Sequence, residues 1–244
     1  MGPLQDAFGH MILDYHNGDR TGREIIERDD GYFDVAGGPA AYFAEYARWL
    51  PHEKRAMQYA RGRVLDVGCG AARHALHLQG KGLDVTGIDV SPLALKVSRA
   101  RGLKKARLLP FTGVDPSLGT FDTITTLGNN FGLFGSPGRA RWLLRKLKRM
   151  TSDGARIISE STHVYQTTNK FHLDYHRLNR RRGRMAGQTR LKVHYRMYTT
   201  PWFDYLLVSQ PEMEKILEGT GWKVNRFLES GASPYIAVIE KTAD

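Results

Sequence analysis

Residues 64–79, VLDVGCGAARHALHLQ, place a glycine turn between a short apolar run and a helical pattern. The run from Val64 to Val67 predicts a buried strand, and the residues after the second glycine predict a helix. A chain turns in this way when its backbone must pass close to a group bound at the N-terminus of the helix. The stretch predicts an α/β fold with a ligand at the turn, and it leaves the kind of ligand open.

From residue 63 onward, strand patterns alternate with helix patterns. We expect strands at 63–68, 83–90, 105–111, 121–128 and 155–161, with helices at 72–80, 91–102 and 136–150 between them. Ser91 followed by Pro92, and Ser136, are typical helix starts. A helix and two strands follow near the C-terminus, at 211–221, 222–230 and 233–241. The pattern predicts a doubly wound, mostly parallel sheet with helices on both faces.

Two segments lie outside this alternation. Residues 1–60 show helical and loop patterns without a strand-like run, with helices expected at 39–50 and 52–60, and they predict a helical cap. In residues 161–205, β-branched and aromatic residues flank a glycine, so we expect strands there. The predicted organisation is a cap (1–60), a ligand-binding domain (61–160 and 206–244) and an inserted lid (161–205).

The chain has 244 residues and a single cysteine, Cys69, inside the glycine turn. One cysteine excludes a disulfide framework and a multi-cysteine metal site. No apolar run approaches the roughly 18 residues of a membrane-spanning helix, and the first residues lack a signal-peptide pattern. We therefore expect a cytoplasmic protein without a membrane partner.

The net charge of +11 is unevenly spread. The lid segment holds nine Lys or Arg residues against Asp174 and Asp204, which gives it +7. Such an excess favours an acidic partner such as a nucleic acid, a phosphate or a carboxylate. A solvated surface without a partner is an equal alternative.

Three interpretations compete for the glycine turn. It could be purely structural, or it could hold a dinucleotide, although Arg73 then occupies the third glycine position of that fingerprint. The third interpretation uses two acids. Asp89 ends the next strand, where a carboxylate suits the two hydroxyls of a ribose, and Asp66 precedes the turn, where it suits a positively charged ligand.

The pair VLDVGCG and GIDVSPLAL resembles the class I S-adenosylmethionine-dependent methyltransferases over about residues 60–160 and the C-terminal helix and strand pair. The resemblance implies a seven-stranded Rossmann-like sheet with S-adenosylmethionine as the cofactor. It implies that Asp66, Gly68, Cys69 and Gly70 line the methionine end, that Asp89 holds the ribose and that Val90 packs on the adenine. The family's third glycine is Ala72 here.

The family often has an acid after the third strand, where this chain has Pro110 and Phe111. Adenine is then held by backbone groups and apolar contact. After the fourth strand, Gly128 and Asn129 are implied to border the cofactor, and Asn130 the acceptor. The alternative for the asparagines is a loop in which they tolerate unusual backbone angles.

Methyl transfer from a sulfonium is an in-line displacement for which a general base is optional. His172 and His176 are the candidates for such a base, because they share one face if their segment is helical. No third ligand accompanies them, so we expect no metal. By resemblance, the cap and the lid enclose the acceptor, with Tyr32, Asn130 and Trp202 as contact candidates and Phe33, Tyr42, Phe43 and Phe203 as further wall residues.

The predicted function is methyl transfer from S-adenosylmethionine to a small acceptor, which the lid arginines would select as an anion. The alternatives are an RNA methyltransferase with the lid on phosphates, a cofactor-binding protein without activity and a nucleotide-dependent oxidoreductase. The oligomeric state and the attacked atom (N, O or C) stay open.

Overall fold

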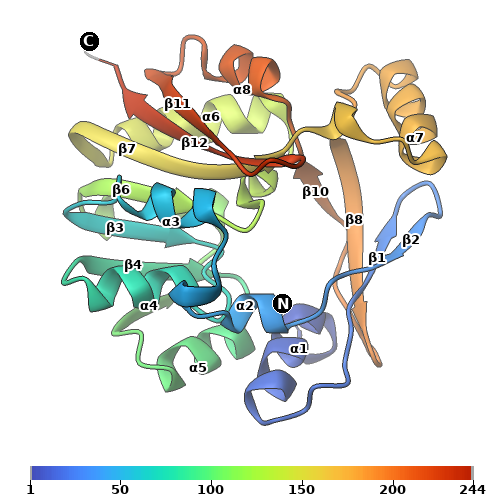
Figure 1. The fold of residues 1–244 in the computed structure, drawn as a ribbon, viewed down its shortest axis with the longest axis horizontal. Coiled ribbons are helices and arrows are strands. Elements are labelled where there is room, and N and C mark those ends of the chain that lie inside the picture. Colours follow the sequence, from blue (N-terminus) through green and yellow to red (C-terminus); the bar gives the residue numbers. More distant parts are fainter. Residues whose placement is uncertain (1, 243–244) are drawn as a thin grey trace.

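The computed structural model describes residues 2–242 and contains two sheets (Figure 1). The larger one has the strand order β11-β12-β7-β6-β3-β4-β5, and its members β3 to β7 are parallel. Its strands are β3 (Arg63–Val67), β4 (Asp84–Asp89), β5 (Lys105–Leu108), β6 (Phe121–Thr126), β7 (Thr151–Thr162), β11 (Trp222–Glu229) and β12 (Pro234–Lys241). β12 is antiparallel to both of its neighbours. This is the predicted seven-stranded, mostly parallel sheet.

The helices of this sheet begin where the sequence signals them. Ser91 and Ser136 cap their helices by accepting from the backbone N–H groups of Ala94 and Arg139, and Ser209 forms a capping box. The helices are α4 (Arg73–Gly80), α5 (Pro92–Ala100), α6 (Pro137–Lys148) and α8 (Gln210–Leu217). Two apolar clusters of buried side chains, one on each face of the sheet, form the core.

The smaller sheet is antiparallel and has the order β10-β8-β1-β2, with β9 beside β8. β8 (Gln188–Tyr195), β9 (Tyr198–Thr199) and β10 (Phe203–Leu206) are the strands expected in the lid, and α7 (Lys170–Arg181) precedes them. β1 (Ile25–Arg28) and β2 (Phe33–Val35) come from the N-terminal segment. The expectation that this segment has no strands was therefore wrong. Ile25 and Ile26 form a strand because β8 provides a partner for them, and no local pattern could reveal that partner.

Only parts of the N-terminal segment are helical, namely α1 (Ala7–His16), the short α2 (Ala40–Phe43) and α3 (Pro51–Met57). The helix expected over 39–50 stops at Phe43. Trp49 then donates its indole N–H to the carbonyl of Ala44, and Tyr46 stacks on His77 of α4 at 4.2 Å between ring centroids. Tertiary contacts thus replace the local helical pattern.

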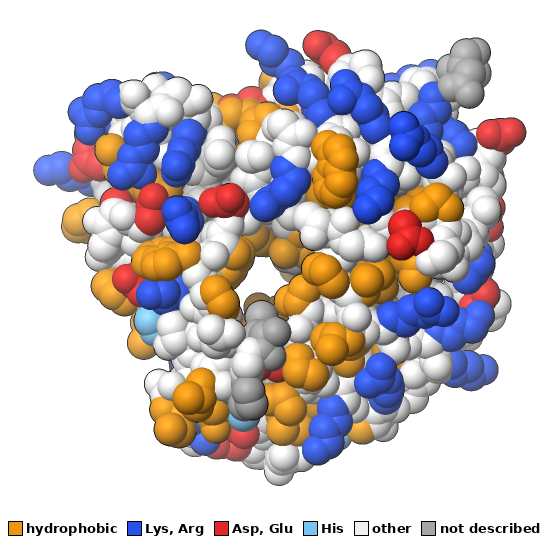
Figure 2. All heavy atoms as spheres, turned by 180° about the vertical axis from the view of Figure 1, so that it is seen from behind, with side chains coloured by type: hydrophobic (Ala, Val, Ile, Leu, Met, Phe, Trp, Pro, Cys, Tyr) orange, Lys and Arg blue, Asp and Glu red, His pale blue; other side chains and the backbone are white. Residues whose placement is uncertain are grey.

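Helix α1 joins the two sheets. It packs on α5 of the large sheet and on β8 of the small one, so that Met11, Ile12, Val97 and Val193 share one apolar cluster. Figure 2 shows an opening bordered by hydrophobic side chains at the boundary between the two sheets. Within the described residues, no helix is long and apolar enough to cross a membrane.

Candidate active site

The glycine turn lies at the carboxyl end of the central strand β3. β4 and β6 flank β3 on its two sides, and ligands of open α/β sheets bind where neighbouring strands diverge in this way. Gly68 and Gly70 have φ angles of +67° and +53°. Because L side chains rarely adopt such angles, glycine is what lets the backbone turn here.

Ala72 adopts the same left-handed conformation, with a φ of +64°. It is the residue that stands where the resembling family has its third glycine. An alanine with this φ costs about 1–2 kcal/mol relative to a right-handed conformation. The turn therefore keeps the geometry of a three-glycine turn, although one glycine is missing.

The two acids expected to bind the ligand are buried beside the turn. Asp66 is 3% exposed and accepts a 2.6 Å hydrogen bond from the hydroxyl of Thr125. Burial raises the pKa of Asp66 to about 7, although the Thr125 hydrogen bond opposes the rise. A carboxyl group with such a pKa changes its charge near neutral pH.

Asp89 is 8% exposed and organises the turn directly. Its two carboxylate oxygens accept from the backbone N–H groups of Gly70 and Ser91, each at 2.9 Å. Burial raises the pKa of Asp89, and these backbone donors oppose the rise. Each oxygen keeps a further lone pair, which is what two ribose hydroxyls require.

An exposed apolar surface follows Asp89. Val90 is 46% exposed, and Leu108, the register partner of Asp89 on β5, is 59% exposed. Pro110 is exposed too, whereas the Phe111 ring is buried 4.9 Å from the ring of Phe134. The side chains available to an adenine are thus Val90, Leu108 and Pro110, and Phe111 supports them from the core.

The Cys69 side chain points into the core. A Cβ atom at Gly87 of β4 would lie 2.9 Å from its sulfur, and burial raises the pKa of its thiol well above the usual value. Cys69 therefore offers the site its backbone and no reactive thiolate.

The loop after β6 is fixed by its own side chains. The Gly128 N–H donates to Glu160 at 2.6 Å, and Asn129 accepts from the Thr162 hydroxyl at 2.8 Å. The Asn130 side-chain amide donates to the carbonyls of Val67 and Gly68. Asn129 has a φ of +62°, which is the unusual backbone angle that the loop alternative expects. Asn130 ties this loop to the glycine turn.

Helix α1 covers the glycine turn. A Cβ atom placed at Gly70 would lie 3.7 Å from both Phe8 and Ile12. Asp6, which caps α1, accepts a 2.9 Å hydrogen bond from the hydroxyl of Ser91. A ligand at the turn is therefore covered by the N-terminal helix as well as by the large sheet.

Acids and phenols gather between the two sheets. Glu24 precedes β1, Glu160 lies near the end of β7, and Tyr205 lies on β10. Burial and the charge of the nearby Glu24 raise the pKa of the Tyr42 phenol, and the Tyr205 hydroxyl donates to the carbonyl of Asn129 at 2.7 Å. Burial raises the pKa values of Glu24 and Glu160.

The cation next to this cluster is already paired. Arg73, at the start of α4, forms an ion pair with Glu53, which also lies 3.6 Å from His74. Burial alone would raise the pKa of Glu53, but the His74 contact and the Arg73 charge outweigh it and lower this pKa to about 2. Burial lowers the pKa of His74 to about 4.

His172 and His176 lie on one face of α7, as expected, and line a cavity of about 510 Å³ under the lid. Thr162, the partner of Asn129, lines the same cavity and links it to the loop after β6. His176 is buried and its Nδ1 has no hydrogen-bond partner. Burial lowers the pKa values of both histidines, which keeps their imidazoles neutral at pH 7.

Tyr32 and Trp202 lie among lid residues. The Tyr32 ring is 5.5 Å from that of Phe171 and 5.4 Å from that of His172. The Lys192 ammonium lies 4.5 Å from the ring centroid of Trp202. These contacts of Tyr32 and Trp202 help to hold the lid together.

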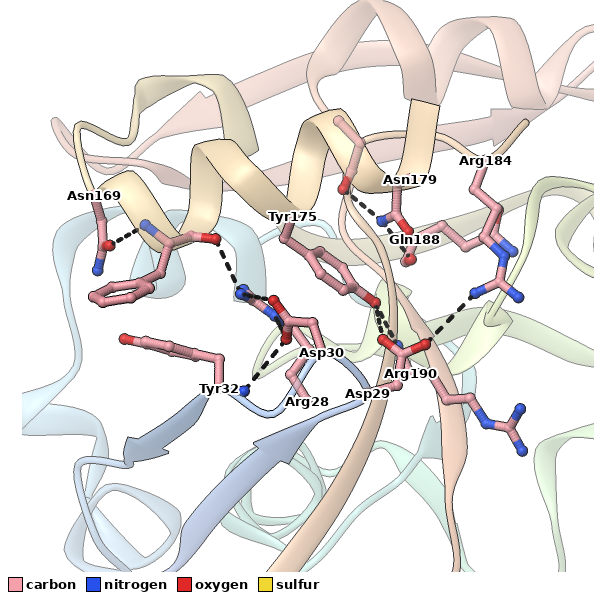
Figure 3. A network of polar contacts seen from close by, with 12 residues as sticks. Arg28, Asp29, Asp30, Tyr32, Asn169, Tyr175, Asn179, Arg184, Gln188 and Arg190 are labelled. Carbon is pink, nitrogen blue, oxygen red and sulfur yellow. Dashed lines mark hydrogen bonds and ion pairs between the residues drawn. The ribbon is translucent and has the colours of Figure 1, made fainter. Parts of the chain in front are cut away.

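Figure 3 shows how the β1–β2 hairpin is bound to α7. Arg28 makes two 2.8 Å hydrogen bonds to Asp30, and Tyr175 donates to Asp29 at 2.6 Å. Five of the nine lid cations have an acidic partner: Arg177, Arg182, Arg184, Lys192 and Arg196. The other four, Lys170, Arg180, Arg181 and Arg190, are exposed. The lid cations are therefore either paired with an acid or exposed to solvent.

The sequence analysis missed Glu24, Glu160 and Tyr205 as site residues. Glu160 could have been found, because it is an acid at the carboxyl end of a predicted parallel strand. Glu24 and Tyr205 carry no local signal, since they reach the cluster through the small sheet. Among the described side chains, no group of three His, Cys, Asp or Glu residues is arranged to hold a metal ion.

Comparison with known proteins agrees with this geometry. Residues 64–154 match a family model described as a methyltransferase domain. A tRNA U34 carboxymethyltransferase of Proteus mirabilis is 34% identical over 126 residues, which are 48% of this chain and 36% of that protein. A ubiquinone biosynthesis O-methyltransferase of Idiomarina loihiensis is 34% identical over 71 residues, 27% of this chain and 29% of that protein. The chain thus spans about a third of the length of these curated relatives.

Solved structures share the whole fold. A SAM-dependent methyltransferase from Bacteroides fragilis, in complex with S-adenosyl-L-homocysteine, has a TM-score of 0.83 and 24% identity, covering 100% of this chain and 98% of that one. The CcbJ methyltransferase from Streptomyces caelestis has a TM-score of 0.60 and 14% identity, covering 99% of this chain and all of that one. Because these matches cover almost the whole chain, they include the small sheet as well as the large one.

Proposed function

The chain belongs to the class I S-adenosylmethionine-dependent methyltransferases, and from that premise we propose that it transfers the methyl group of S-adenosylmethionine to a small acceptor enclosed between its two sheets. The observation that carries the proposal is the turn from Gly68 to Gly70 with Asp89 folded against it. A left-handed glycine turn and a buried carboxylate together suit a nucleoside whose ribose approaches the backbone closely.

The residues at the turn fit this cofactor from end to end. Asp89 would hold the ribose hydroxyls, while Val90 and Leu108 would contact the adenine. Asp66 and the loop at Gly128 would lie at the methionine end. The bound cofactor supplies an activated methyl group. The chain itself has to orient the acceptor, exclude water and take up any proton that is released.

Helix α1 and strand β10 cover the site, which favours a small acceptor. Helix α1 packs over the glycine turn through Phe8 and Ile12, and the strand β10 brings Tyr205 onto the loop after β6. The lid cations that would track a phosphate chain are mostly paired with acids, as Arg182 is with Asp29. These contacts favour a small acceptor over a polynucleotide.

An RNA acceptor is the second candidate, because the Proteus mirabilis relative is named for a tRNA and because the chain carries a net charge of +11. Binding of a generic RNA across a salt series separates the two. Submicromolar affinity near physiological salt that falls steeply as salt rises supports RNA. Weak binding supports the small acceptor.

The cofactor assignment is tested by calorimetry. Titrations with S-adenosylmethionine, S-adenosylhomocysteine and NADH should show binding of the first two and none of the third. Binding of NADH alone would favour the oxidoreductase alternative. Binding of S-adenosylmethionine without any methyl transfer to a metabolite extract would favour a protein that only binds the cofactor.

A further inference from the structure

The charges between the two sheets are mainly negative. Glu24 and Glu160 are both more than 90% buried, and Asp66 lies near the carboxyl end of β3, which β6 separates from the strand of Glu160. Two cations lie near these acids. Arg73 is compensated by its ion pair with Glu53, and Arg23, whose charge acts to lower the pKa of Glu24, donates to the carbonyl of Gly37. The lid arginines, which the sequence suggested as an anion site, are paired with acids or exposed. The space therefore suits a cation better than an anion.

Glu24 has an unused hydrogen-bonding atom. Its side chain is 3% exposed, and its Oε2 has no hydrogen-bond partner. Leaving a buried carboxylate oxygen without a donor destabilises the folded protein. Such an atom is expected where a ligand supplies the missing donor.

The position of Glu24 relates it to the cofactor turn. Side chains alternate along a strand, so Glu24 shares a face of the small sheet with Ile26, which packs in the cluster around α1. Burial and the charge of the nearby Glu24 carboxylate raise the pKa of the Tyr42 phenol, which places the two side chains close together. The Tyr42 ring lies 4.9 Å from that of Phe8, and Phe8 covers Gly70. A single aromatic ring thus separates the Tyr42–Glu24 pair from the turn.

Tyr205 closes the other side of this space. Burial raises the pKa of Tyr205, and the phenol of Tyr42 and the charge of Glu160 raise it further. Its ring covers Gly132, where a Cβ atom would lie 2.1 Å from it. Glu160 and Tyr205 therefore both contact the loop after β6, and Tyr42 lies close enough to act on the Tyr205 phenol.

We propose that the methyl acceptor is an amine, held by the acids and phenols between the sheets, and that Glu24 accepts the proton that the amine must lose before it reacts. This inference rests on the proposed methyltransferase function. The ammonium form would supply the donor that Glu24 Oε2 lacks.

The reaction balances without a further reactant. The ammonium group gives one proton to the Glu24 carboxylate and becomes a neutral amine. Its nitrogen lone pair then forms the N–CH₃ bond while the S–CH₃ bond breaks, and that electron pair stays on sulfur as S-adenosylhomocysteine. The product is a methylated ammonium ion, so the total charge is unchanged. Burial raises the pKa of Glu24, which favours its holding the transferred proton.

The test compares two cofactor analogues and needs no knowledge of the acceptor. Sinefungin carries an amine-bearing carbon in place of the sulfur of S-adenosylhomocysteine, so its ammonium lies where the methyl group would leave. In Glu24→Gln, sinefungin should bind about tenfold more weakly, since hydrogen bonds and charge attraction to an ionised group are lost. S-adenosylhomocysteine should bind within twofold of its usual affinity.

The matched control is Glu27→Gln. Glu27 lies on β1 with its side chain on the opposite face, bonded to His194 at 2.7 Å, so both affinities should stay unchanged. If Glu24→Gln fails to fold, Glu24→Asp withdraws the same carboxylate by one methylene and should weaken sinefungin in the same selective way.

The outcomes are distinct. Selective loss of sinefungin binding supports the amine proposal. Unchanged sinefungin binding in the Glu24 variant, or equal loss of both analogues in a folded protein, overturns it, because Glu24 then either faces no cation or serves the shared part of the cofactor. If neither analogue binds the unaltered chain, the proposed function itself fails.

Discussion

The Thr125 hydroxyl donates a 2.6 Å hydrogen bond to the carboxylate of Asp66, and the two residues are register partners on the neighbouring parallel strands β6 and β3. This hydrogen bond links β6, the strand before the loop at Gly128, to Asp66, the acid before the glycine turn. It stabilises the ionised form of Asp66 against the effect of burial, which raises its pKa to about 7.

Replacing Thr125 by valine should move the pH dependence of cofactor binding. Without the hydroxyl, the pKa of Asp66 rises further, so a larger fraction is protonated at neutral pH. Affinity for S-adenosylhomocysteine, measured by calorimetry from pH 6 to 9, should reach its half-maximum at a higher pH than in the unaltered protein. The control is Thr123→Val, because the Thr123 hydroxyl donates to the backbone carbonyl of Arg61 and not to Asp66. An identical midpoint in Thr125→Val would show that Asp66 does not attract the cofactor.

Asp66→Asn should stabilise the protein without cofactor in alkaline solution. Folding raises the pKa of Asp66 from near 4 to about 7. The stability that protonated Asp66 contributes is therefore fully present below pH 4 and is lost as the pH rises through about 7. At pH 8 the free energy of unfolding should increase by about 2–4 kcal/mol, with little change at pH 4. Denaturant unfolding at both pH values measures this. If the variant is less stable at pH 8, ionised Asp66 does not destabilise the folded protein and the prediction is wrong.

Asp89→Ala should weaken S-adenosylhomocysteine binding about ten- to a hundredfold. Hydrogen bonds to a charged acceptor contribute about 1.5–3 kcal/mol, and the same oxygens position the N–H groups of Gly70 and Ser91. Asp84→Ala is the control, since Asp84 starts the same strand and pairs with Lys105 at the surface. Calorimetry with both variants decides. Equal affinities would remove Asp89 from the cofactor site.

Gly70→Ala should lose cofactor binding with only a small loss of stability. The added methyl group meets Phe8 and Ile12 at an ordinary 3.7 Å, so the strain is that of a φ of +53°. That strain costs about 1–2 kcal/mol, or a few degrees in Tm for a chain of this size. Titration with S-adenosylhomocysteine and a thermal melt measure the two effects. A variant that binds normally would mean that no ligand approaches this backbone.

Gly68→Ala provides a contrast to Gly70→Ala. In the structure, a Cβ atom at Gly68 lies 2.7 Å from the Asn130 amide and 2.9 Å from Leu133. The stability of this variant should therefore fall more than that of Gly70→Ala.

The glycine turn and the two acids beside it could be predicted from sequence because these residues are local. Asp66, Gly68 and Gly70 lie within five positions, and Asp89 ends the next strand. The same short-range logic predicted the parallel strands and the caps at Ser91 and Ser136, all of which are confirmed. Local spacing fixes these features, so no knowledge of the tertiary structure was needed.

The residues gathered between the two sheets could be predicted only in part. Tyr42 was expected as a wall residue, and Glu160 is an acid near the carboxyl end of a predicted strand, but Glu24 and Tyr205 come together with them because β1 and β10 both pair with β8. The lid's excess of arginines suggested an anion, but the composition did not reveal the acids that pair with them, such as Asp29 on the β1–β2 hairpin. Charge counts describe a segment, whereas the electrostatics of a site depend on which charges face it.

The pairing of Ile25 with His194 has a consequence for how the chain is made. A ribosome adds roughly 5–20 residues per second, so β1 emerges many seconds before the strand that it needs. During that time Ile25 and Ile26 have no sheet to join, while β3 to β6 can already begin to pair with one another. Contacts so distant in sequence also slow folding, because a long loop must close first. We therefore expect the parallel strands β3 to β7 to pair first, and β1 to remain unpaired in the newborn chain until β8 has been synthesised.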